Sequence, residues 1–318
     1  MFDIAVIIPC FNEEQTIKKV TCDIRKNLPD AAIFIYDNNS TDQTAQIVRK
    51  MQKTDPKLFL KTESSQGKGC VIRRAFREID ADTYVMIDGD DTYAAEYAPR
   101  LAELVENGAD MAIGDRISSG DYGCENKRRF HSFGNAFVKK AVNLIFRAEI
   151  DDLLTGFRAF SYEFVKTFPV TSRGFEIETE ITVHALDNRL SVKQIPVGYR
   201  DRPEGSFSKL STVKDGIKVI RKIVSLFENY RPLLFFGILA GILMAAALAL
   251  FLPVLGDYLA TSAVARFPTL IVSGFSALCA VLLFTAGLIL SSLHQKARRE
   301  FEINFINSFS EKRQKKGI

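Results

Sequence analysis

Two long uncharged stretches near the C-terminus place the strongest constraint on what this chain can fold into. Residues 233–252 read LLFFGILAGILMAAALALFL, and residues 269–293 read TLIVSGFSALCAVLLFTAGLILSSL. At a helical rise of about 1.5 Å per residue, the first stretch is ~30 Å long, which matches the hydrocarbon core of a bilayer. Two buried core helices are the alternative, but core helices are usually shorter and keep a polar face. We therefore predict two transmembrane helices joined by a short outside loop.

The charge distribution predicts how these spans are oriented. The segments 205–232 and 294–318 each carry a net charge of +4, whereas residues 1–204 carry −4 and the loop 253–268 is neutral. Because positive charge is retained on the cytoplasmic side, we expect residues 1–204 and both termini in the cytoplasm of a multi-pass plasma (inner) membrane protein. The acidic balance of residues 1–204 argues against nucleic-acid binding. Five cysteines without a CxxC pair argue against a zinc ribbon or a disulfide scaffold.

The basic segments that flank the spans contain helical patterns. In residues 211–229, apolar side chains recur every three or four positions with Lys and Arg between them. Such a juxtamembrane helix suits an anionic membrane surface, although a helix packed on the large domain gives the same pattern. Residues 296–316 predict a similar basic helix after the second span. Gly237 and Gly241 form a small-xxx-small pair, which is compatible with a homo-oligomer assembled through the spans.

Short apolar runs alternate with helical patterns in the N-terminal third of the chain. The predicted strands are 3–8, 31–36, 57–61, 83–87 and 109–113, and the predicted helices lie near 13–27, 42–53, 69–79 and 95–106. Strands separated by helices form a mostly parallel, Rossmann-like α/β sheet. Ligands bind such sheets at the carboxyl ends of the strands, so we expect the polar residues that follow each strand to converge on one site.

A cluster of carboxylates follows the fourth predicted strand. Asp88, Asp90 and Asp91 surround Gly89, which lets the backbone turn tightly. Closely spaced carboxylates repel each other, so this cluster needs a cation or protonation, and its hard oxygen ligands suit Mg²⁺ or Mn²⁺. A surface turn is the alternative, but the position directly after a buried strand favours the metal.

Two further loops carry polar residues suited to a nucleotide. Asp37 ends the second predicted strand, where its carboxylate can accept hydrogen bonds from a base or a ribose. Gly67-Lys68-Gly69 places one cation before a helix, where it can contact a phosphate. This loop lacks the spacing of a Walker A motif, so it carries weight only beside the other loops.

These motifs together resemble a known family. IIPCFNEE, DNNSTDQT, GKG and DGDD, in this order, look like family 2 glycosyltransferases of the GT-A fold. The resemblance covers residues 4–116 and extends through LLTGFRAF (153–160) and GFEIETE (174–180) to RPEGSFSKL (202–210). With two C-terminal spans, the chain looks like the polyprenyl-phosphate branch, which includes dolichyl-phosphate mannose synthases and bacterial undecaprenyl-phosphate glucosyltransferases.

The resemblance implies a nucleotide-sugar donor, a polyprenyl phosphate acceptor at the bilayer, and transfer with inversion. It implies that the nucleoside is held by Pro9, Phe11, Glu13 and Asp37, with Lys68 also on the nucleotide. Asp88 and Asp90 would hold the metal and the diphosphate, with Asp90 as the direct ligand. The residues that match those gripping the acceptor phosphate are Arg116, Arg128 with Ser132, and Arg202, with Lys209 adding charge and Arg129 as the alternative to Arg128. For each Arg, a surface ion pair is the alternative.

Two departures from the family pattern bear on the donor. Asn38 stands at the second acidic position of the usual D-D-x-S motif, and Thr92 stands where mannose synthases have Gln. These departures favour a UDP-sugar over a GDP-sugar. The absence of Trp argues against a processive polymerase with a Q-x-x-R-W motif.

The acceptor decides whether the reaction needs a base. A polyprenyl phosphate is already an anion, so positioning and charge handling suffice. A membrane-bound enzyme acting on a hydroxyl of a glycolipid is the alternative, and it would need a carboxylate base such as Glu178 or Glu180. Glu176 is a further candidate base; it shares one face of a predicted helix with Glu180, and a solvated helix face is the other interpretation of that pair. A non-catalytic adaptor with a decayed nucleotide site is a third hypothesis, against which the intact acidic loops argue.

Overall fold

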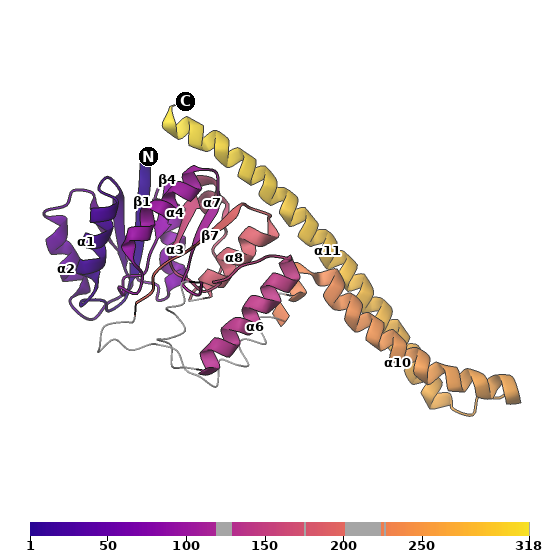
Figure 1. The fold of residues 1–318 in the computed structure, drawn as a ribbon. Helices are drawn as coiled ribbons and strands as arrows, with labels where there is room; N and C mark the ends of the chain where they lie inside the picture. The colour runs from indigo at the N-terminus through magenta and orange to yellow at the C-terminus, as the bar shows by residue number, and fades with distance from the viewer. Residues whose placement is uncertain (119–128, 175, 201–223, 226, 318) are drawn as a thin grey trace. The chain divides into compact units, whose positions relative to one another are not determined.

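The structure is a computed structural model that describes residues 1–118, 129–174, 176–200, 224–225 and 227–317 (Figure 1). The chain divides into two compact units. The sheet unit comprises Met1–Thr212 together with Phe301–Ile318, and the span unit comprises Val213–Glu300. The predicted juxtamembrane helix 211–229 lies mostly outside the described residues.

The sheet unit is built on a seven-stranded mixed sheet with the order β3-β2-β1-β4-β6-β5-β7. Its strands are β1 (Phe2–Cys10), β2 (Ala32–Asp37), β3 (Leu58–Thr62), β4 (Ala81–Met86), β5 (Met111–Asp115), β6 (Arg158–Ser161) and β7 (Val192–Pro196). Strands β1 to β4 are mutually parallel, β5 is parallel to β7, and β6 runs antiparallel between β4 and β5. The predicted mostly parallel α/β sheet is therefore confirmed.

Helices cover both faces of this sheet. The helices of the unit are α1 (Ile17–Asn27), α2 (Thr44–Gln52), α3 (Lys68–Glu78), the 3₁₀ turn η1 (Ala95–Tyr97), α4 (Ala98–Glu106), α6 (Arg129–Phe146), α7 (Tyr162–Thr167) and α8 (Ile177–Asp187). One face packs aliphatic side chains of β1 and β2, such as Val6 and Ile33, against α1, α2 and α4. On the other face, Phe76 of α3 meets Phe160 of β6 and Phe168 just after α7. The alternation of strand side chains supplies both layers of the core.

The five predicted strands and four predicted helices of the first 115 residues are all present, with boundaries shifted by a few residues. Two strands, β6 and β7, had no prediction. Strand β6 has only four residues, RAFS, and its pairing partners lie far away in the sequence. Because β6 inserts between them, the consecutive strands β4 and β5 of the alternating pattern are not neighbours in the sheet.

The two apolar stretches form the helices α10 (Pro232–Thr261) and α11 (Phe267–Lys316). Both are long and apolar enough to cross a membrane, and only 17% and 11% of the residues in their most apolar windows are buried. That exposure argues against two core helices of a soluble protein, because core helices bury their apolar side chains. Helix α11 continues beyond its apolar part through the basic C-terminal segment.

Candidate active site

The loops that follow β1 and β2 are joined at one edge of the sheet. Cys10 and Asp37, the last residues of these strands, lie opposite each other in the parallel ladder. The backbone amide of Glu13 donates a hydrogen bond to Thr44 Oγ1 at the head of α2 (2.9 Å). Of the residues expected to hold a nucleoside, the structure thus brings Glu13 and Asp37 to the same edge. Asp37 is almost fully buried, and its Oδ1 accepts a hydrogen bond from the amide of Ser40 (3.3 Å).

The expected nucleoside residues Pro9 and Phe11 flank the end of β1. Pro9 is buried within the strand, and Phe11 is half-buried just beyond it. Pro9 pairs with Tyr36 and Cys10 pairs with Asp37, so Pro9 and Asp37 both lie at the carboxyl end of the β1–β2 pair. This is the edge where open α/β sheets bind their ligands.

Asn38, a departure from the family pattern, has a structural role. Its side-chain nitrogen donates to the carbonyls of Glu63 (2.9 Å) and Ser65 (2.8 Å), and its Oδ1 accepts from the amide of Gly67 (2.7 Å). An ionised carboxylate accepts hydrogen bonds but donates none, so an Asp would leave both carbonyls without this partner. The amide at this position therefore shapes the loop between β3 and α3.

The acidic loop after β4 holds its carboxylates in different environments. Asp90 is buried, and its Oδ1 accepts hydrogen bonds from the hydroxyl (2.7 Å) and the amide (3.3 Å) of Thr92. Asp91 has a left-handed backbone (φ 60°) and forms an ion pair with Lys19 of α1. Thr92, at the position where a Gln was expected for mannose synthases, thus orients Asp90 directly.

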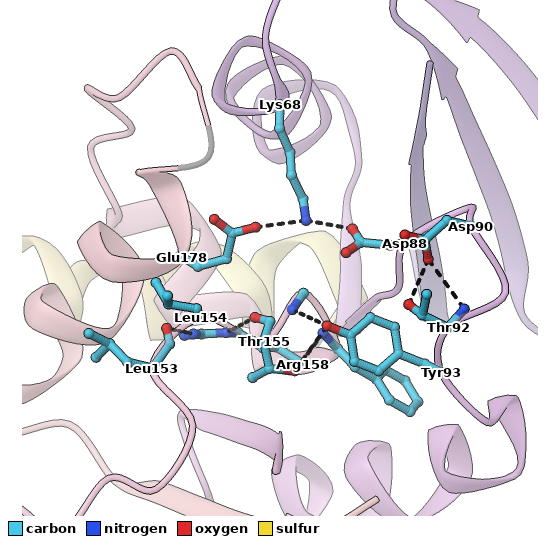
Figure 2. A network of polar contacts seen from close by, with 12 residues as sticks. Lys68, Asp88, Asp90, Thr92, Tyr93, Leu153, Leu154, Thr155, Arg158 and Glu178 are labelled. Carbon is cyan, nitrogen blue, oxygen red and sulfur yellow. Dashed lines mark hydrogen bonds and ion pairs between the residues drawn. The ribbon is translucent and has the colours of Figure 1, made fainter. Parts of the chain in front are cut away.

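Lys68 connects the GKG loop to two carboxylates (Figure 2). As the first residue of α3, it places its Nζ 2.5 Å from Asp88 Oδ1 and 2.8 Å from Glu178 Oε1 of α8. The side chains of Lys68 and Glu178 are only 7% and 6% exposed. Three elements that are far apart in the sequence therefore meet in one charged cluster, which we call the Lys68 cluster (Lys68, Asp88 and Glu178).

Two glycines make room for the Lys68 cluster. A Cβ at Gly156, just before β6, would lie 2.2 Å from Asp88 Oδ2 and 2.8 Å from Lys68 Nζ. Gly67 has a φ of +125°, and a Cβ there would lie 2.1 Å from the carbonyl oxygen of Arg173. The glycine before Lys68 thus lets the backbone of the loop that precedes α8 approach closely.

The charges of the Lys68 cluster depend on one another. Burial acts to lower the pKa of Lys68, but the carboxylates of Asp88 and Glu178 outweigh it and raise that pKa above its ordinary value. Burial also raises the pKa of Glu178, and the nearby Lys68 opposes this rise. The lysine therefore stays charged and allows two carboxylates to stay close together.

The glutamates considered as a base have other partners. Glu178 pairs with Lys68, as described above. Glu180 accepts hydrogen bonds from the amides of Thr171 (2.9 Å) and Ser172 (2.7 Å). Burial raises the pKa of Glu180, but the hydrogen bonds from Ser172 and Thr171 more than offset it, so that pKa lies below its ordinary value. Glu178 and Glu180 are therefore held by partners within the fold, whereas Glu176, just before α8, is exposed.

Arg116, expected to grip the acceptor phosphate, follows the last residue of β5. Its Nε and Nη2 contact Asp152 Oδ2 (2.6 Å) and Oδ1 (3.0 Å). The guanidinium carbon lies 5.7 Å and 5.4 Å from the ring centroids of Tyr93 and Tyr199. A bidentate pair of this kind fixes the plane of the guanidinium group.

Arg158 is a site-forming residue that the sequence prediction missed. Its guanidinium is fully buried and donates to the carbonyls of Leu153 (2.7 Å) and Thr155 (3.0 Å) (Figure 2). It also donates to Thr182 Oγ1 (2.7 Å). Burial lowers the pKa of Arg158 to about 10, which still leaves it charged at neutral pH. The charged residue within the apolar LLTGFRAF segment was the available signal, because a buried Arg must have carbonyl partners.

Several expected acceptor residues lie outside the described part of the chain. These residues are Arg128, Arg202 and Lys209. Ser132 and Arg129, the alternative to Arg128, lie in helix α6.

The described residues offer a cation two neighbouring carboxylates, Asp88 and Asp90. Within the ranges that the structure describes, no group of three or more His, Cys, Asp or Glu side chains converges as a metal cage. Mg²⁺ is commonly held by one or two carboxylates together with water and substrate phosphates. The donor set therefore fits a cation shared with a diphosphate, with Asp88 already held by Lys68 and Asp90 by Thr92.

Comparison with known proteins identifies one family. The model of "Glycosyl transferase family 2" matches residues 5–168, which include the ends of β1, β2 and β4 and the glycine before β6. The matched range contains Asp37, Lys68, Asp88 and Asp90.

Curated relatives extend over most of the chain. The chain is 29% identical to glycosyltransferase AglJ of Haloferax volcanii, covering 94% of this chain and 97% of that protein. It is 28% identical to a dolichyl-phosphate hexose transferase of the same organism (70% and 92% covered). It is 26% identical to the polyprenol monophosphomannose synthase of Mycolicibacterium smegmatis (65% and 80% covered).

Solved structures share the fold at lower identity. The glucosyl-3-phosphoglycerate synthase of Mycobacterium tuberculosis in complex with UDP superposes with a TM-score of 0.54 at 19% identity, covering 71% of this chain and 79% of that one. The same enzyme crystallised with Mn²⁺, UDP-glucose and glycerol 3-phosphate gives a TM-score of 0.52. This likeness supports the GT-A arrangement of strands and helices.

Proposed function

The chain belongs to glycosyl transferase family 2, and on this premise we propose that it transfers a sugar with inversion from a nucleotide-sugar to a polyprenyl phosphate. Its activity as a glycosyltransferase follows from the family and from the named transferases among its relatives. The lipid phosphate acceptor is supported by the names of two relatives, a dolichyl-phosphate hexose transferase and a polyprenol monophosphomannose synthase.

The observation that carries the proposal is the Lys68 cluster beside Asp90. Asp88 follows the buried strand β4 and is held by Lys68, while Thr92 holds Asp90 two residues later. A bound Mg²⁺ or Mn²⁺ would neutralise the diphosphate as it departs from the sugar. The chain's own part is to keep these two carboxylates oriented before the donor binds, which lowers the cost of reorganisation during the reaction.

The partners of the glutamates favour a phosphate acceptor over a hydroxyl acceptor. A hydroxyl needs a general base within hydrogen-bonding reach of its proton. Glu178 is buried against Lys68, and Glu180 accepts hydrogen bonds from the loop at residues 171–172. A phosphate monoester is already anionic and attacks the anomeric carbon without giving up a proton. The residues that bind the acceptor phosphate in this proposal are Arg116, Arg128 with Ser132, Arg202 and Lys209.

The proposal places the reaction at the cytoplasmic face of the plasma (inner) membrane. It divides the chain into a catalytic domain (1–204), a juxtamembrane helix (205–232), two spans (233–293) and a basic tail (294–318). The two apolar helices support membrane association, and the basic flanks support cytoplasmic termini. The donor is a UDP-sugar in this proposal, on the basis of Asn38 and Thr92.

Transfer to lipid tests the proposal. Membranes containing the chain are incubated with a panel of labelled nucleotide-sugars, undecaprenyl phosphate and Mg²⁺ or Mn²⁺, and the lipids are extracted. We expect label from a UDP-sugar in an acid-labile glycosyl phosphate lipid, and loss of that product with a chelator. Asp90→Asn should abolish transfer. The control Asp91→Asn, at a neighbouring carboxylate that pairs with Lys19, should retain it. Label in an acid-stable glycolipid would favour the hydroxyl acceptor instead.

A further inference from the structure

The C-terminal end of α11 has one face that is shielded from solvent. We call residues 301–316 the tail helix, and they belong to the sheet unit. Phe301, Phe305 and Lys312 are half-buried and Ser308 is buried, whereas the residues between them are exposed. These positions are spaced by four, three and four residues, so they share one face of a helix. That face therefore packs against other residues of the sheet unit.

The tail helix ends on a set of carboxylates that we call the acidic surface (Asp80, Asp82 and Glu163). Lys312 Nζ lies 3.2 Å from Glu163 Oε1 and 3.8 Å from Asp82 Oδ1. Lys315 contacts Asp80 (2.9 Å), and Lys316 contacts Asp82 (2.6 Å). The acidic surface thus lies on α7 and around the first residues of β4, the amino-terminal end of the strand that leads to Asp88.

Opposite charges hold the tail helix against the acidic surface. Glu163 is only 4% exposed, and a carboxylate buried to this degree needs a cation or hydrogen-bond donors. Without the tail helix, the acidic surface has three carboxylates and one cation, Lys166, which pairs with Asp80 (2.9 Å). The three tail lysines supply the cations that pair with these three carboxylates. With the tail helix in place, Glu163 thus has the cation that its burial requires.

An aromatic contact connects the tail helix to the helix that carries Glu178. Phe301 meets the ring of His184 on α8 at a centroid distance of 5.0 Å and an angle of 82°. His184 lies six residues after Glu178 on the same helix, and Glu178 pairs with Lys68. The tail helix thus contacts both α7, through Glu163, and α8, through His184.

We propose that the tail helix is a docking segment of the sheet unit, which the acidic surface holds by ion pairs and which braces α7 and α8. The basic residues that predict a membrane-surface helix after the second span then bind carboxylates of the same chain rather than anionic lipid. The brace stabilises the helix that positions Glu178, although no tail residue reaches the Lys68 cluster. This inference goes beyond the proposed function, and its test does not need enzymatic transfer.

The tail helix also offers a clear alternative, which the test must separate. Ile303, Ile306 and Phe309 are exposed on its other faces. Together with its basic residues, they are what an interfacial helix would insert into an anionic bilayer. Docking depends on the specific pair between Lys312 and Glu163, whereas lipid binding depends on the exposed apolar side chains and on the total positive charge, so variants at 312 and 313 can distinguish them.

Hydrogen exchange of the full-length protein in nanodiscs tests the docking. One set of nanodiscs contains only phosphatidylcholine, and the other also contains anionic phosphatidylglycerol. We expect equal protection of the tail helix in both. Lys312→Glu should speed exchange in the tail helix and in α8 about tenfold or more, because it places like charges at Glu163. Arg313→Glu, the same charge change at an exposed neighbour, should leave both segments unchanged.

Reversal of the pair completes the test. Lys312→Glu combined with Glu163→Lys should restore protection. Where that double variant fails to fold, Lys312→Gln should still speed exchange, and Arg313→Gln should not. Protection that requires phosphatidylglycerol, or equal effects of the variants at 312 and 313, would overturn the docking and assign the tail helix to the lipid surface.

Discussion

Replacing Lys68 with Met removes the one cation of the Lys68 cluster and retains a side chain of similar length. The side chains of Lys68 and Glu178 are 7% and 6% exposed, so the variant leaves Glu178 buried beside Asp88 without its paired lysine. Removing one partner of a buried ion pair costs about 3–5 kcal/mol. For a domain of this size, that corresponds to a fall in Tm of about 6–20 °C. Lys61→Met is the matched control, since its pair with Glu78 (3.8 Å) is exposed and is worth at most about 1 kcal/mol.

Thermal unfolding of the purified full chain, followed at several pH values, measures the effect. Burial raises the pKa of Glu178, and replacing Lys68 removes the charge that most opposes that rise. A carboxyl whose folded pKa is raised gains stability as pH falls below that pKa, so the deficit of Lys68→Met should shrink toward acid and widen toward neutral pH. Adding Glu178→Gln should recover part of the loss. A deficit no larger than that of Lys61→Met, or one that does not change with pH, would refute the charge argument.

Three other changes test separate parts of the structure. Gly156→Ala should reduce kcat/KM about 10²-fold, because its Cβ would lie 2.2 Å from Asp88 Oδ2 and must displace that carboxylate; full activity would contradict this close approach. Asn38→Asp should lower Tm by about 2–12 °C, since loss of its two donors costs about 1–3 kcal/mol; an unchanged Tm would mean that these hydrogen bonds are dispensable. Burial lowers the pKa of His184 from 6.5 to about 4, so the unfolded chain binds a proton in that interval that the folded chain does not, and stability should fall as pH drops through it. His184→Phe should flatten the acid side of the Tm profile, and an unaltered profile would exclude His184 as the cause.

The sequence predicted the parts of the fold that local patterns encode. Five strands and four helices of the N-terminal third follow from the alternation of apolar runs with helical periodicity. Strand β6 was missed because its four residues are too few for a period, and its antiparallel place between β4 and β5 depends on contacts distant in sequence. The same distance hid the partner of Lys68, since Glu178 follows it by 110 residues.

Asn38 shows a second reason why sequence patterns fall short. The family pattern has an acidic residue at this position, and from the sequence alone we interpret its replacement by Asn38 as a preference for a UDP-sugar donor. In the structure its amide group makes three hydrogen bonds that determine where the loop before Lys68 runs. A motif comparison records which residue type is absent, whereas the hydrogen-bond geometry records what the present one does.

The Lys68 cluster also suggests how the site is prepared for an anionic leaving group before the donor binds. Two neighbouring carboxylates, Asp88 and Asp90, repel each other before the donor binds, so holding them close together needs compensation from the chain itself. Lys68 provides that compensation within the chain, and Glu178 keeps the lysine from swinging toward solvent. A divalent ion bound by Asp88 and Asp90 would add the positive charge that the departing diphosphate needs. On this argument, a positive charge at position 68 matters more than its shape, and Lys68→Arg should keep more of the stability than Lys68→Met if the guanidinium can be accommodated beside Gly156.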